Sequence, residues 1–341
     1  MTTPTIPKTA RAVVLDAPNA PWAIKEVPVP VPAAGEILIK VLACGVCHSD
    51  TVIQAGHMGT YPRIPGHEII GTVVALGEGE KKWKVGDRVG GGWHGGHDGS
   101  CTPCGRGFFQ ACKNVTINGI FRDGGFAEYT TLRTEATVRI PPSAPAADYA
   151  PLLCAGVTCY NGIRKMNITP GDTVAIQGVG GVGHLGIQYS RKMGYRTVAI
   201  SSGADKRDFA KELGAHEYVD TSAEDAAAAL QKMGGAALIV VTAPNPEVIG
   251  ALVGGLAPLG KLLILAPVGE VPIDTIPLIL QGLSVHGWPA GHALDSEEAI
   301  SFAEVQDVNC LVEKFAFDNV EEAVERMMSG KVRFRAVLVM E

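Results

Sequence analysis

The sequence predicts an α/β protein with two domains, a β-rich domain followed by a domain built on a doubly wound parallel sheet. The first observation is the length, because 341 residues correspond to about two domains at roughly 150 residues each. The second is a series of short apolar runs before residue 150, separated by segments rich in glycine and proline, which is typical of β-rich structure. The third is the alternation of strand-like and helical segments after residue 150, which favours a parallel sheet.

The N-terminal part is predicted to consist of short strands with irregular connections. A proline-rich turn is expected at 27–36. The segment 94–125 is rich in glycine, cysteine and histidine and has no clear periodicity, so we expect a long ordered loop there. Such loops are uncommon unless they are functional or held together. The expected strands are 11–16, 23–27, 36–45, 69–76, 87–93, 127–132 and 136–140.

The C-terminal part begins with a compact β run at 173–176 and a glycine-rich turn. Val182, Leu185, Tyr189 and Met193 then recur near helical spacing, which predicts a helix. Further strands are expected at 197–201, 217–220, 237–243, 261–269 and 334–340. Further helices are expected at 206–215, 224–234, 245–260, 296–306 and 319–331.

Composition excludes several classes of protein. Hydrophobic residues make up 46% and charged residues 19%, so the chain can bury a core and is not disordered. The net charge of −6 argues against a nucleic-acid partner, and no apolar run reaches the roughly 18 residues that cross a membrane. The N-terminal sequence has no signal-peptide apolar region, so we expect a cytoplasmic protein. Its eight cysteines are then expected to be metal ligands, catalytic groups or buried thiols rather than disulfides.

The glycine-rich turn has the pattern G-x-G-x-x-G in the run Gly178-Val179-Gly180-Gly181-Val182-Gly183. Gly178 permits a tight turn, Gly180 lets the backbone approach a pyrophosphate, and Gly183 allows close packing of helix on strand. A glycine-rich turn that binds nothing is the alternative. The strand before the turn and the helix and strand after it favour a dinucleotide site.

The end of the second strand of this unit predicts which cofactor is bound. An acidic residue there would bind the ribose 2′-hydroxyl of NAD and repel a 2′-phosphate. This chain lacks the acid, and Asp205 lies too far along to replace it. Two hydroxyls and two cations suited to a phosphate follow instead, from Ser201, Ser202, Lys206 and Arg207. We therefore expect NADP, with NAD as the alternative.

A metal site is predicted from three scattered residues. Cys47 and Cys154 supply two thiols and His67 an imidazole, a ligand set that suits zinc with one open coordination position. The alternative is three unrelated buried residues, because cysteine is often a small buried hydrophobic residue.

Four motifs occur in order along the chain: GVCHSD at 45–50, GHEIIG at 66–71, LLCAGVT at 152–158 and GVGGVGHLGIQYSRKMGYR at 178–196. With them the chain resembles the zinc-dependent alcohol dehydrogenases of the medium-chain dehydrogenase/reductase family over nearly its whole length. The resemblance implies a GroES-like catalytic domain formed by 1–153 and 291–341. It also implies a Rossmann dinucleotide-binding domain at 154–290.

The resemblance also implies residue roles around the first zinc. Cys47, His67 and Cys154 would bind catalytic zinc, and Glu68 is the carboxylate that can approach the metal. Asp50 would orient His67, a role that second-sphere carboxylates commonly have.

A proton path is implied beside this zinc. Ser49 would take the alcohol proton, and His48 would bind the pyrophosphate or help the relay. The family often has a histidine where this chain has Val52, so the end of the proton path is open. Trp93 lies where the family lines its substrate pocket.

A second zinc site is implied near residue 100, where the family usually has four cysteines. Cys101, Cys104 and Cys112 match the last three, and Asp98 stands where the first belongs. A carboxylate oxygen can ligate zinc, so structural zinc held by Asp98 and three cysteines is expected. An empty or weak site and a site with His97 as fourth ligand are the alternatives.

These features predict a zinc-dependent oxidoreductase that transfers a hydride between NADP(H) and a primary alcohol or aldehyde. The alternatives are an NAD-linked alcohol or polyol dehydrogenase, a biosynthetic family member with a narrow substrate or non-redox chemistry, and a non-catalytic cofactor-binding protein. The family forms dimers and tetramers, so a homodimer or homotetramer is expected. Neither a nucleic acid nor a membrane is an expected partner.

Overall fold

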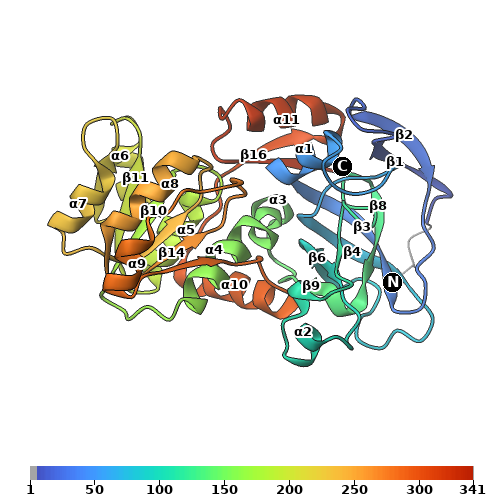
Figure 1. The fold of residues 1–341 in the computed structure, drawn as a ribbon. Coiled ribbons are helices and arrows are strands. Elements are labelled where there is room, and N and C mark those ends of the chain that lie inside the picture. Colours follow the sequence, from blue (N-terminus) through green and yellow to red (C-terminus); the bar gives the residue numbers. More distant parts are fainter. Residues whose placement is uncertain (1–5, 341) are drawn as a thin grey trace. The chain divides into compact units, whose positions relative to one another are not determined.

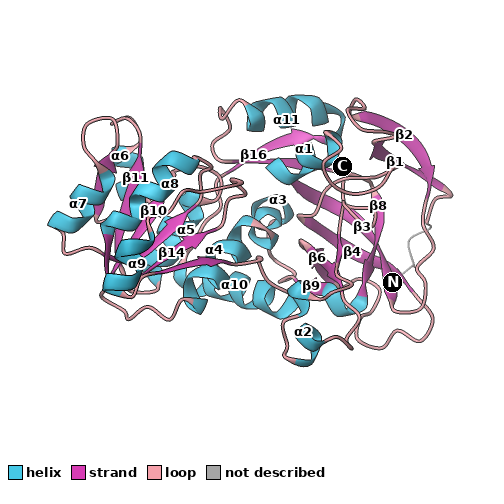
Figure 2. Ribbon diagram, in the orientation of Figure 1, coloured by secondary structure: helices cyan, strands magenta, loops and turns pink. Residues whose placement is uncertain are grey.

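The computed structural model describes residues 6–340, and the chain forms two compact units (Figure 1). Unit 1 contains the described residues up to Cys154, together with Gly291–Ser301 and the described residues from Cys310 onward. Unit 2 contains Ala155–Ala290 and Phe302–Asn309. Both units mix helices with strands, as the colouring in Figure 2 shows, and the α/β fold class is confirmed.

The division differs from the expected one at two places. Cys154 groups with unit 1, and Phe302–Asn309 groups with unit 2. The second difference has a packing cause, because the Phe302 ring lies 5.3 Å from Tyr160 and 5.9 Å from Tyr189, both in unit 2. Helix α10 (Ala293–Gln306) therefore begins in unit 1 and ends in unit 2.

Unit 1 is built mainly of antiparallel strands with short helices. Its strands are β1 (Thr9–Val14), β2 (Ala23–Pro28), β3 (Glu36–Val46), β4 (Ile69–Leu76), β5 (Arg88–Gly91), β6 (His94–Gly96), β7 (Thr116–Ile117), β8 (Tyr129–Arg133), β9 (Thr137–Arg139), β16 (Val312–Ala316) and β17 (Arg335–Val339). Its helices are α1 (His48–Gln54), α2 (Thr102–Gly105), α3 (Ala146–Tyr149) and α11 (Val320–Met328). Its 3-10 turns are η1 (Phe109–Ala111), η2 (Thr134–Ala136), η3 (Ala150–Leu153) and η5 (Phe317–Asn319).

The main sheet of unit 1 has the order β16-β17-β3-β4-β5-β9, and β8 also pairs with β3. β3 is its long central strand, and most of its 11 residues are buried. The C-terminal strand β17 runs antiparallel beside it, with Ala336 opposite Val46. This register brings Arg335, at the start of β17, next to the segment that follows β3.

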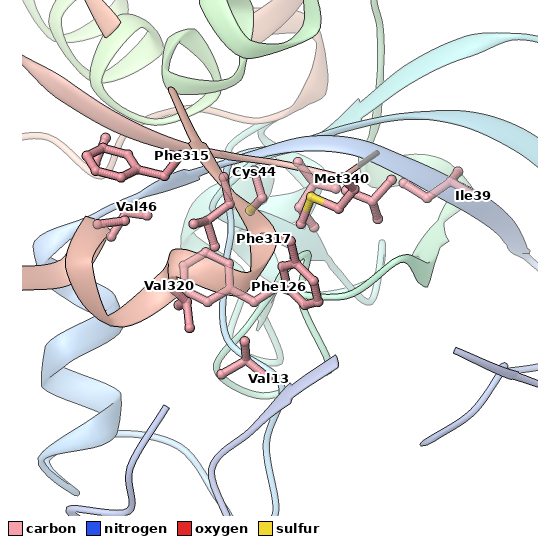
Figure 3. Close-up of a cluster of buried hydrophobic side chains, with 14 of the residues drawn as sticks. Val13, Ile39, Cys44, Val46, Phe126, Phe315, Phe317, Val320 and Met340 are labelled. Carbon is pink, nitrogen blue, oxygen red and sulfur yellow. The ribbon is translucent and has the colours of Figure 1, made fainter. Parts of the chain in front are cut away.

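The core of unit 1 lies between this sheet, α11 and the segment around Phe126 (Figure 3). Phe126, Cys44 and Val46 are fully buried there, and Phe317 and Val320 from the C-terminal part pack into the same cluster. Residues far apart in sequence therefore share one core, which ties the last strand to the first part of the chain.

The segment 94–125 is not the single loop that we expected. β6 pairs with β7, with His94 opposite Ile117, and α2 and η1 lie between them. Strands of two or three residues are too short to show an alternating pattern, which is why this segment lacks a periodic pattern of apolar residues.

Unit 2 contains a parallel sheet with helices on both faces. Its strands are β10 (Thr173–Gln177), β11 (Arg196–Ser201), β12 (Glu217–Asp220), β13 (Ala236–Val241), β14 (Leu256–Ile264) and β15 (Ser284–Gly287). Its helices are α4 (Ala155–Lys165), α5 (Gly183–Lys192), α6 (Arg207–Glu212), α7 (Ala226–Lys232), α8 (Pro246–Leu252) and α9 (Thr275–Gln281), with the 3-10 turn η4 (Val253–Gly255).

The sheet order β12-β11-β10-β13-β14-β15 is fully parallel. Buried side chains of α7 and α8 pack on one face, while α4 and α5 contact the other through Gly162 and Gly186. The direction of winding reverses between β10 and β13, and ligands bind beyond the carboxyl ends of strands at such a switch point.

Some element predictions for unit 2 were wrong or missing. The expected helix 245–260 ends at Leu252, and strand β14 begins at Leu256 after two glycines. α4, α9 and β15 were not predicted; α9 and β15 are only seven and four residues long. In unit 1 the same is true of α3 and β16.

Within residues 6–340, no helix is both long enough and apolar enough to cross a bilayer.

Candidate active site and dinucleotide site

Strand β3 ends at Val46 and delivers Cys47 to the start of helix α1. Cys47 has extended backbone angles and is the N-cap residue, and its N–H donates to Asp50 Oδ2 at 2.8 Å. This carboxylate satisfies a backbone donor that a helix N-terminus otherwise leaves free. The cap therefore fixes the direction in which Cys47 presents its sulfur.

Asp50 also fixes the second segment of the site. It is fully buried, and its Oδ1 accepts the Gly66 N–H at 3.2 Å and lies 3.4 Å from His67 Nδ1. Gly66 has φ +95°, and a Cβ there would lie 2.5 Å from the Phe126 ring, so only glycine fits. One carboxylate thus links the start of α1 to His67, in the geometry of a second-sphere partner.

Four side chains converge at this point. The ligand atoms of Cys47, His67, Glu68 and Cys154 all lie within 4.8 Å of one another. His67 Nε2 is buried and has no hydrogen-bond partner among the described residues, although buried polar atoms are normally paired. Two sulfurs, an imidazole and a nearby carboxylate with an orphaned nitrogen fit a zinc ion.

The pKa values of the two cysteines in this group are shifted in opposite directions. The contact with Cys154, followed by the nearness of His67, holds the pKa of Cys47 well below its usual value. The contact with Cys47 and burial raise the pKa of Cys154 well above its usual value. Two adjacent thiolates repel each other, and a divalent cation between them would remove that repulsion.

Glu68 pairs with a residue that the sequence analysis missed. Arg335 Nη2 donates to Glu68 Oε1, and both side chains are buried. Burial raises the pKa of Glu68 to about 7, and the Arg335 charge opposes this rise. The carboxylate lies against Gly45, where a Cβ would come within 1.9 Å of Glu68 Oε2. Arg335 reaches this place only through the pairing of β17 with β3, which no local pattern announces.

The other residues expected near the metal take different positions. Ser49 Oγ lies 3.8 Å from Cys47 Sγ, which places a hydroxyl beside the ligand cluster. His48 is exposed and lies outside the ligand cluster, and Val52 is half-buried on α1. The Trp93 ring stands edge-on to His67, with ring centroids 5.0 Å apart.

Asp98, Cys101, Cys104 and Cys112 form a second convergent group, with ligand atoms within 4.8 Å of one another. Cys101 Sγ lies 3.5 Å from Cys104 Sγ and 3.7 Å from Cys112 Sγ, and all three thiols are free. Asp98 Oδ1 accepts the Ser100 and Cys101 N–H groups, and these bonds lower the pKa of its carboxyl. An ionised carboxylate and three thiols fit a structural zinc.

His97, the alternative fourth ligand, is directed elsewhere. Its Nδ1 lies 3.2 Å from His94 Nε2, and its ring stacks on Phe109 with centroids 4.2 Å apart. It is not among the residues whose ligand atoms converge. The geometry thus favours Asp98 over His97 in this group.

The glycine-rich turn joins β10 to α5 at the switch point. A Cβ on Gly183 would lie 1.9 Å from the Gly178 carbonyl oxygen, whereas a Cβ on Gly180 would meet nothing within 4 Å. Gly183 therefore permits the close packing of the turn, and Gly180 leaves open space over the backbone. Gly181 and Val182 are half-buried between them. An open backbone cradle before the N-terminus of a ten-residue helix fits a pyrophosphate.

Strand β11 ends at Ser201, and the four expected phosphate-binding residues follow closely. Ser201 and Lys206 are half-buried, and Ser202 and Arg207 are exposed. Sequence reasoning missed two residues of the next strand, Tyr218 and Asp220, which hydrogen-bond to this loop. A cross-strand contact of this kind has no signature in local sequence.

Two family models match the chain: the alcohol dehydrogenase GroES-like domain at residues 33–142 and the zinc-binding dehydrogenase domain at residues 181–305. Alcohol dehydrogenase patD of Penicillium expansum is 55% identical, over 98% of this chain and 99% of its own length. This chain belongs to the zinc-dependent alcohol dehydrogenases of the medium-chain dehydrogenase/reductase family. The alcohol dehydrogenase is thus an oxidoreductase with a GroES-like and a Rossmann-like domain, as predicted.

Solved structures of other family members match this alcohol dehydrogenase over nearly its whole length. A cinnamyl alcohol dehydrogenase of Sorghum bicolor has a TM-score of 0.88 at 29% identity, covering 97% of this chain and 98% of its own. A zinc-binding dehydrogenase of Sinorhizobium meliloti bound to NADP has a TM-score of 0.89 at 26% identity, covering 97% and 99%. Acetophenone reductase of Geotrichum candidum in complex with NAD has a TM-score of 0.87 at 25% identity, covering 98% of both chains. One of these relatives is thus bound to NADP and another to NAD. The alcohol dehydrogenase therefore uses a nicotinamide cofactor, and its family includes enzymes that bind either one.

Proposed function

We propose that this alcohol dehydrogenase transfers a hydride between NADP(H) and a primary alcohol or aldehyde. The observation that carries the cofactor choice is the end of β11, where Ser201 stands in place of an acid. Lys206 and Arg207 supply positive charge nearby, and charge-assisted bonds to a phosphate are strong and directional. The name of the Sorghum neighbour, a cinnamyl alcohol dehydrogenase, supports a primary alcohol as substrate.

The proposed chemistry divides between the bound groups and the chain. When bound, zinc polarises the substrate oxygen and the nicotinamide accepts or donates the hydride. Cys47, His67 and Cys154 would hold the metal, and Asp50 would keep His67 in the orientation that leaves Nε2 free for it. Ser49, whose hydroxyl lies 3.8 Å from Cys47 Sγ, would take the proton from the alcohol.

Two further roles belong to this proposal. His48, exposed at the start of α1, would bind the cofactor pyrophosphate or help to carry the proton outward. Glu68 would approach the metal. In this structure its carboxylate accepts a hydrogen bond from Arg335. Because Val52 cannot accept a proton, the relay beyond Ser49 would use His48 or water.

The strongest alternative is an NAD-linked alcohol or polyol dehydrogenase of the same family. The NAD complex of the Geotrichum neighbour is the observation that favours it. A biosynthetic role with a narrow substrate or without net redox chemistry is favoured only by Val52 in place of a relay histidine. An alcohol dehydrogenase of either cofactor preference should reduce members of a panel of simple aldehydes, whereas a biosynthetic enzyme with a narrow substrate or without net redox chemistry should reduce none.

We also propose that the group around Asp98 holds a structural zinc. Three free sulfurs and an ionised carboxylate converge there within 4.8 Å of one another, an arrangement that a divalent cation would stabilise. Metal binding supplies folding free energy to such segments.

A homodimer or homotetramer is supported by one surface of unit 2. β15 is the last strand of the parallel sheet, and no strand of the described residues pairs with its outer edge. Exposed apolar side chains occur on β14, α9 and β15, namely Leu259, Ile276, Ile279, Leu280 and Val285. Unpaired edges and apolar patches of this kind mark association surfaces. A cytoplasmic location belongs to the same proposal, because free thiols persist in reducing compartments.

The experiment that tests the proposed activity is aldehyde reduction before and after removal of zinc. The purified enzyme, supplied with NADPH, should reduce members of a panel from acetaldehyde to benzaldehyde and cinnamaldehyde. Chelation should abolish turnover and added Zn²⁺ should restore it. Turnover that survives complete loss of zinc would contradict the proposal, and no turnover on any aldehyde would favour the biosynthetic alternative.

A further inference from the structure

The loop that follows β11 is held by two buried side chains of β12. The Tyr218 hydroxyl donates to the Gly203 carbonyl oxygen at 2.6 Å, and Asp220 Oδ1 accepts the Gly203 N–H at 2.8 Å. Gly203 has φ +85°, a conformation that favours glycine. One glycine is thus fixed at both its N–H and its carbonyl group, in the middle of the segment 201–207.

Asp220 is itself firmly placed. Its Oδ1 also accepts the Ser222 N–H at 2.9 Å and the Ser222 hydroxyl at 2.6 Å. These bonds, with the one from Gly203, lower the pKa of Asp220, so the buried carboxyl is ionised near neutral pH. The three donors are directed at the oxygen that faces the loop and offset its charge there.

Tyr218 arranges the charged side of the same loop. The Arg207 guanidinium lies over the Tyr218 ring, 5.1 Å from its centroid, a cation–π contact that restricts a long and exposed side chain. The Ser201 side chain lies beside the Tyr218 hydroxyl and opposes the rise that burial causes in the pKa of Tyr218. One aromatic residue therefore holds Gly203 and restrains Arg207 next to Ser201.

We propose that Tyr218 and Asp220 are positioning residues for cofactor choice, which hold Ser201, Ser202 and Arg207 as a preformed site for the 2′-phosphate of NADP(H). This inference rests on the proposed preference for NADP. A site that is ordered before binding loses less conformational freedom when the ligand arrives. NAD(H) lacks the 2′-phosphate, so its binding gains little from this order.

The test measures the Kd of two nucleotide fragments, 2′,5′-ADP and 5′-AMP, by calorimetry on the full-length, zinc-loaded enzyme. Tyr218→Phe keeps the ring under Arg207 and removes the bond to Gly203, whereas Tyr218→Leu removes both. We expect Tyr218→Phe to raise the Kd of 2′,5′-ADP about threefold to tenfold and Tyr218→Leu to raise it further. The Kd of 5′-AMP should change less than about twofold in both variants, because that ligand leaves the phosphate site empty.

Two matched variants sharpen the test. Tyr195→Phe removes another tyrosine-to-carbonyl bond of unit 2, to Ile168 at 3.4 Å, and should leave both Kd values unchanged. Asp220→Asn should weaken 2′,5′-ADP selectively, because an uncharged amide holds the loop donors less firmly. If Asp220 merely repels the phosphate, the same variant would tighten 2′,5′-ADP, and that result would overturn the inference.

The remaining outcomes separate this inference from the proposed function. If the wild type prefers 2′,5′-ADP and Tyr218→Phe weakens both nucleotides equally or neither, only the role of Tyr218 and Asp220 is refuted. If the wild type prefers 5′-AMP, the NADP proposal fails and this inference fails with it. Thermal unfolding shows whether each variant folds. If Asp220→Asn does not fold, Tyr218→Phe, which removes a single oxygen atom, still decides the test.

Discussion

At the scale of single residues, the site depends on a few groups with no alternative partner. His67 presents a buried Nε2 that no described side chain satisfies, and Asp50 occupies the side of its Nδ1 at 3.4 Å. The residues that converge here could be proposed as metal ligands from the sequence because cysteine and histidine in these motifs are chemically distinctive. Arg335 could not, because its partner Glu68 is 267 residues away and an arginine near the C-terminus carries no local signal.

His67→Ala tests the ligand role. We expect the loss of one zinc ion per chain and a fall in kcat of at least about 10³-fold, because metal-ion catalysis contributes several kcal/mol. Elemental analysis and initial rates measure both quantities. His57→Ala, at an exposed histidine of the same unit, is the control and should keep zinc and activity; full activity in His67→Ala would remove the metal assignment.

Arg335→Met tests the buried ion pair. Loss of the arginine leaves Glu68 buried without its cation, which should lower the free energy of unfolding by about 3–5 kcal/mol, as measured by chemical denaturation. Arg326→Met breaks the more exposed pair with Glu313 and should change stability much less. Equal changes in the free energy of unfolding for the two substitutions would show that the buried Arg335–Glu68 pair stabilises the fold no more than the exposed pair does.

At the scale of elements, the glycines of the turn between β10 and α5 have different roles: Gly183 permits close packing, and Gly180 leaves space for a ligand. Its strand–turn–helix arrangement was predicted from the sequence, and the structure adds the space around each glycine. Short elements such as β6, β7 and β16 were missed because two to five residues give too little periodicity. The helix expected at 245–260 was drawn too long because Leu256 and the residues after it continue an apolar run that also suits a buried strand.

Gly183→Ala and Gly180→Ala should fail in different ways. The first places a methyl group 1.9 Å from the Gly178 carbonyl oxygen, so the backbone must shift and unit 2 should be destabilised. The second meets no protein atom within 4 Å, so stability should be kept while the methyl obstructs the pyrophosphate. Thermal unfolding and NADPH titration distinguish the two, and normal NADPH affinity in Gly180→Ala would argue against a pyrophosphate at this turn.

The lobe around Asp98 gives a further prediction at this scale. Wild-type enzyme should contain two zinc ions per chain and Asp98→Ala about one, with a lower Tm because metal binding stabilises the segment. Asp98→Cys should retain both ions and resist chelation for longer, since it supplies a fourth thiolate. Two zinc ions in Asp98→Ala would instead show that Asp98 is not a ligand.

At the scale of the whole molecule, the order of motifs was more informative than any single one. The proposed zinc ligands come from the end of β3, the loop before β4 and the end of η3, and only their shared arrangement in unit 1 makes a site. The sequence therefore predicted the family and the class of fold, and the residues that it offers as metal ligands do converge. It could not predict the pairing of β17 with β3 or the contacts of β12 with the cofactor loop, because both depend on sheet registers between distant segments.

The measurement that tests the central claim most directly is the ratio of kcat/KM for NADPH to that for NADH, with one aldehyde held at a saturating concentration. We predict a ratio of at least about 10, because β11 ends at a serine rather than at an acid, a second serine and two cations follow it, and one charge-assisted interaction contributes about this factor. Ser201→Asp should lower the ratio below that of the wild type, because the new carboxylate repels the 2′-phosphate and binds the ribose hydroxyl. A wild-type ratio of one or less, or a ratio unchanged by Ser201→Asp, would contradict the account of this loop.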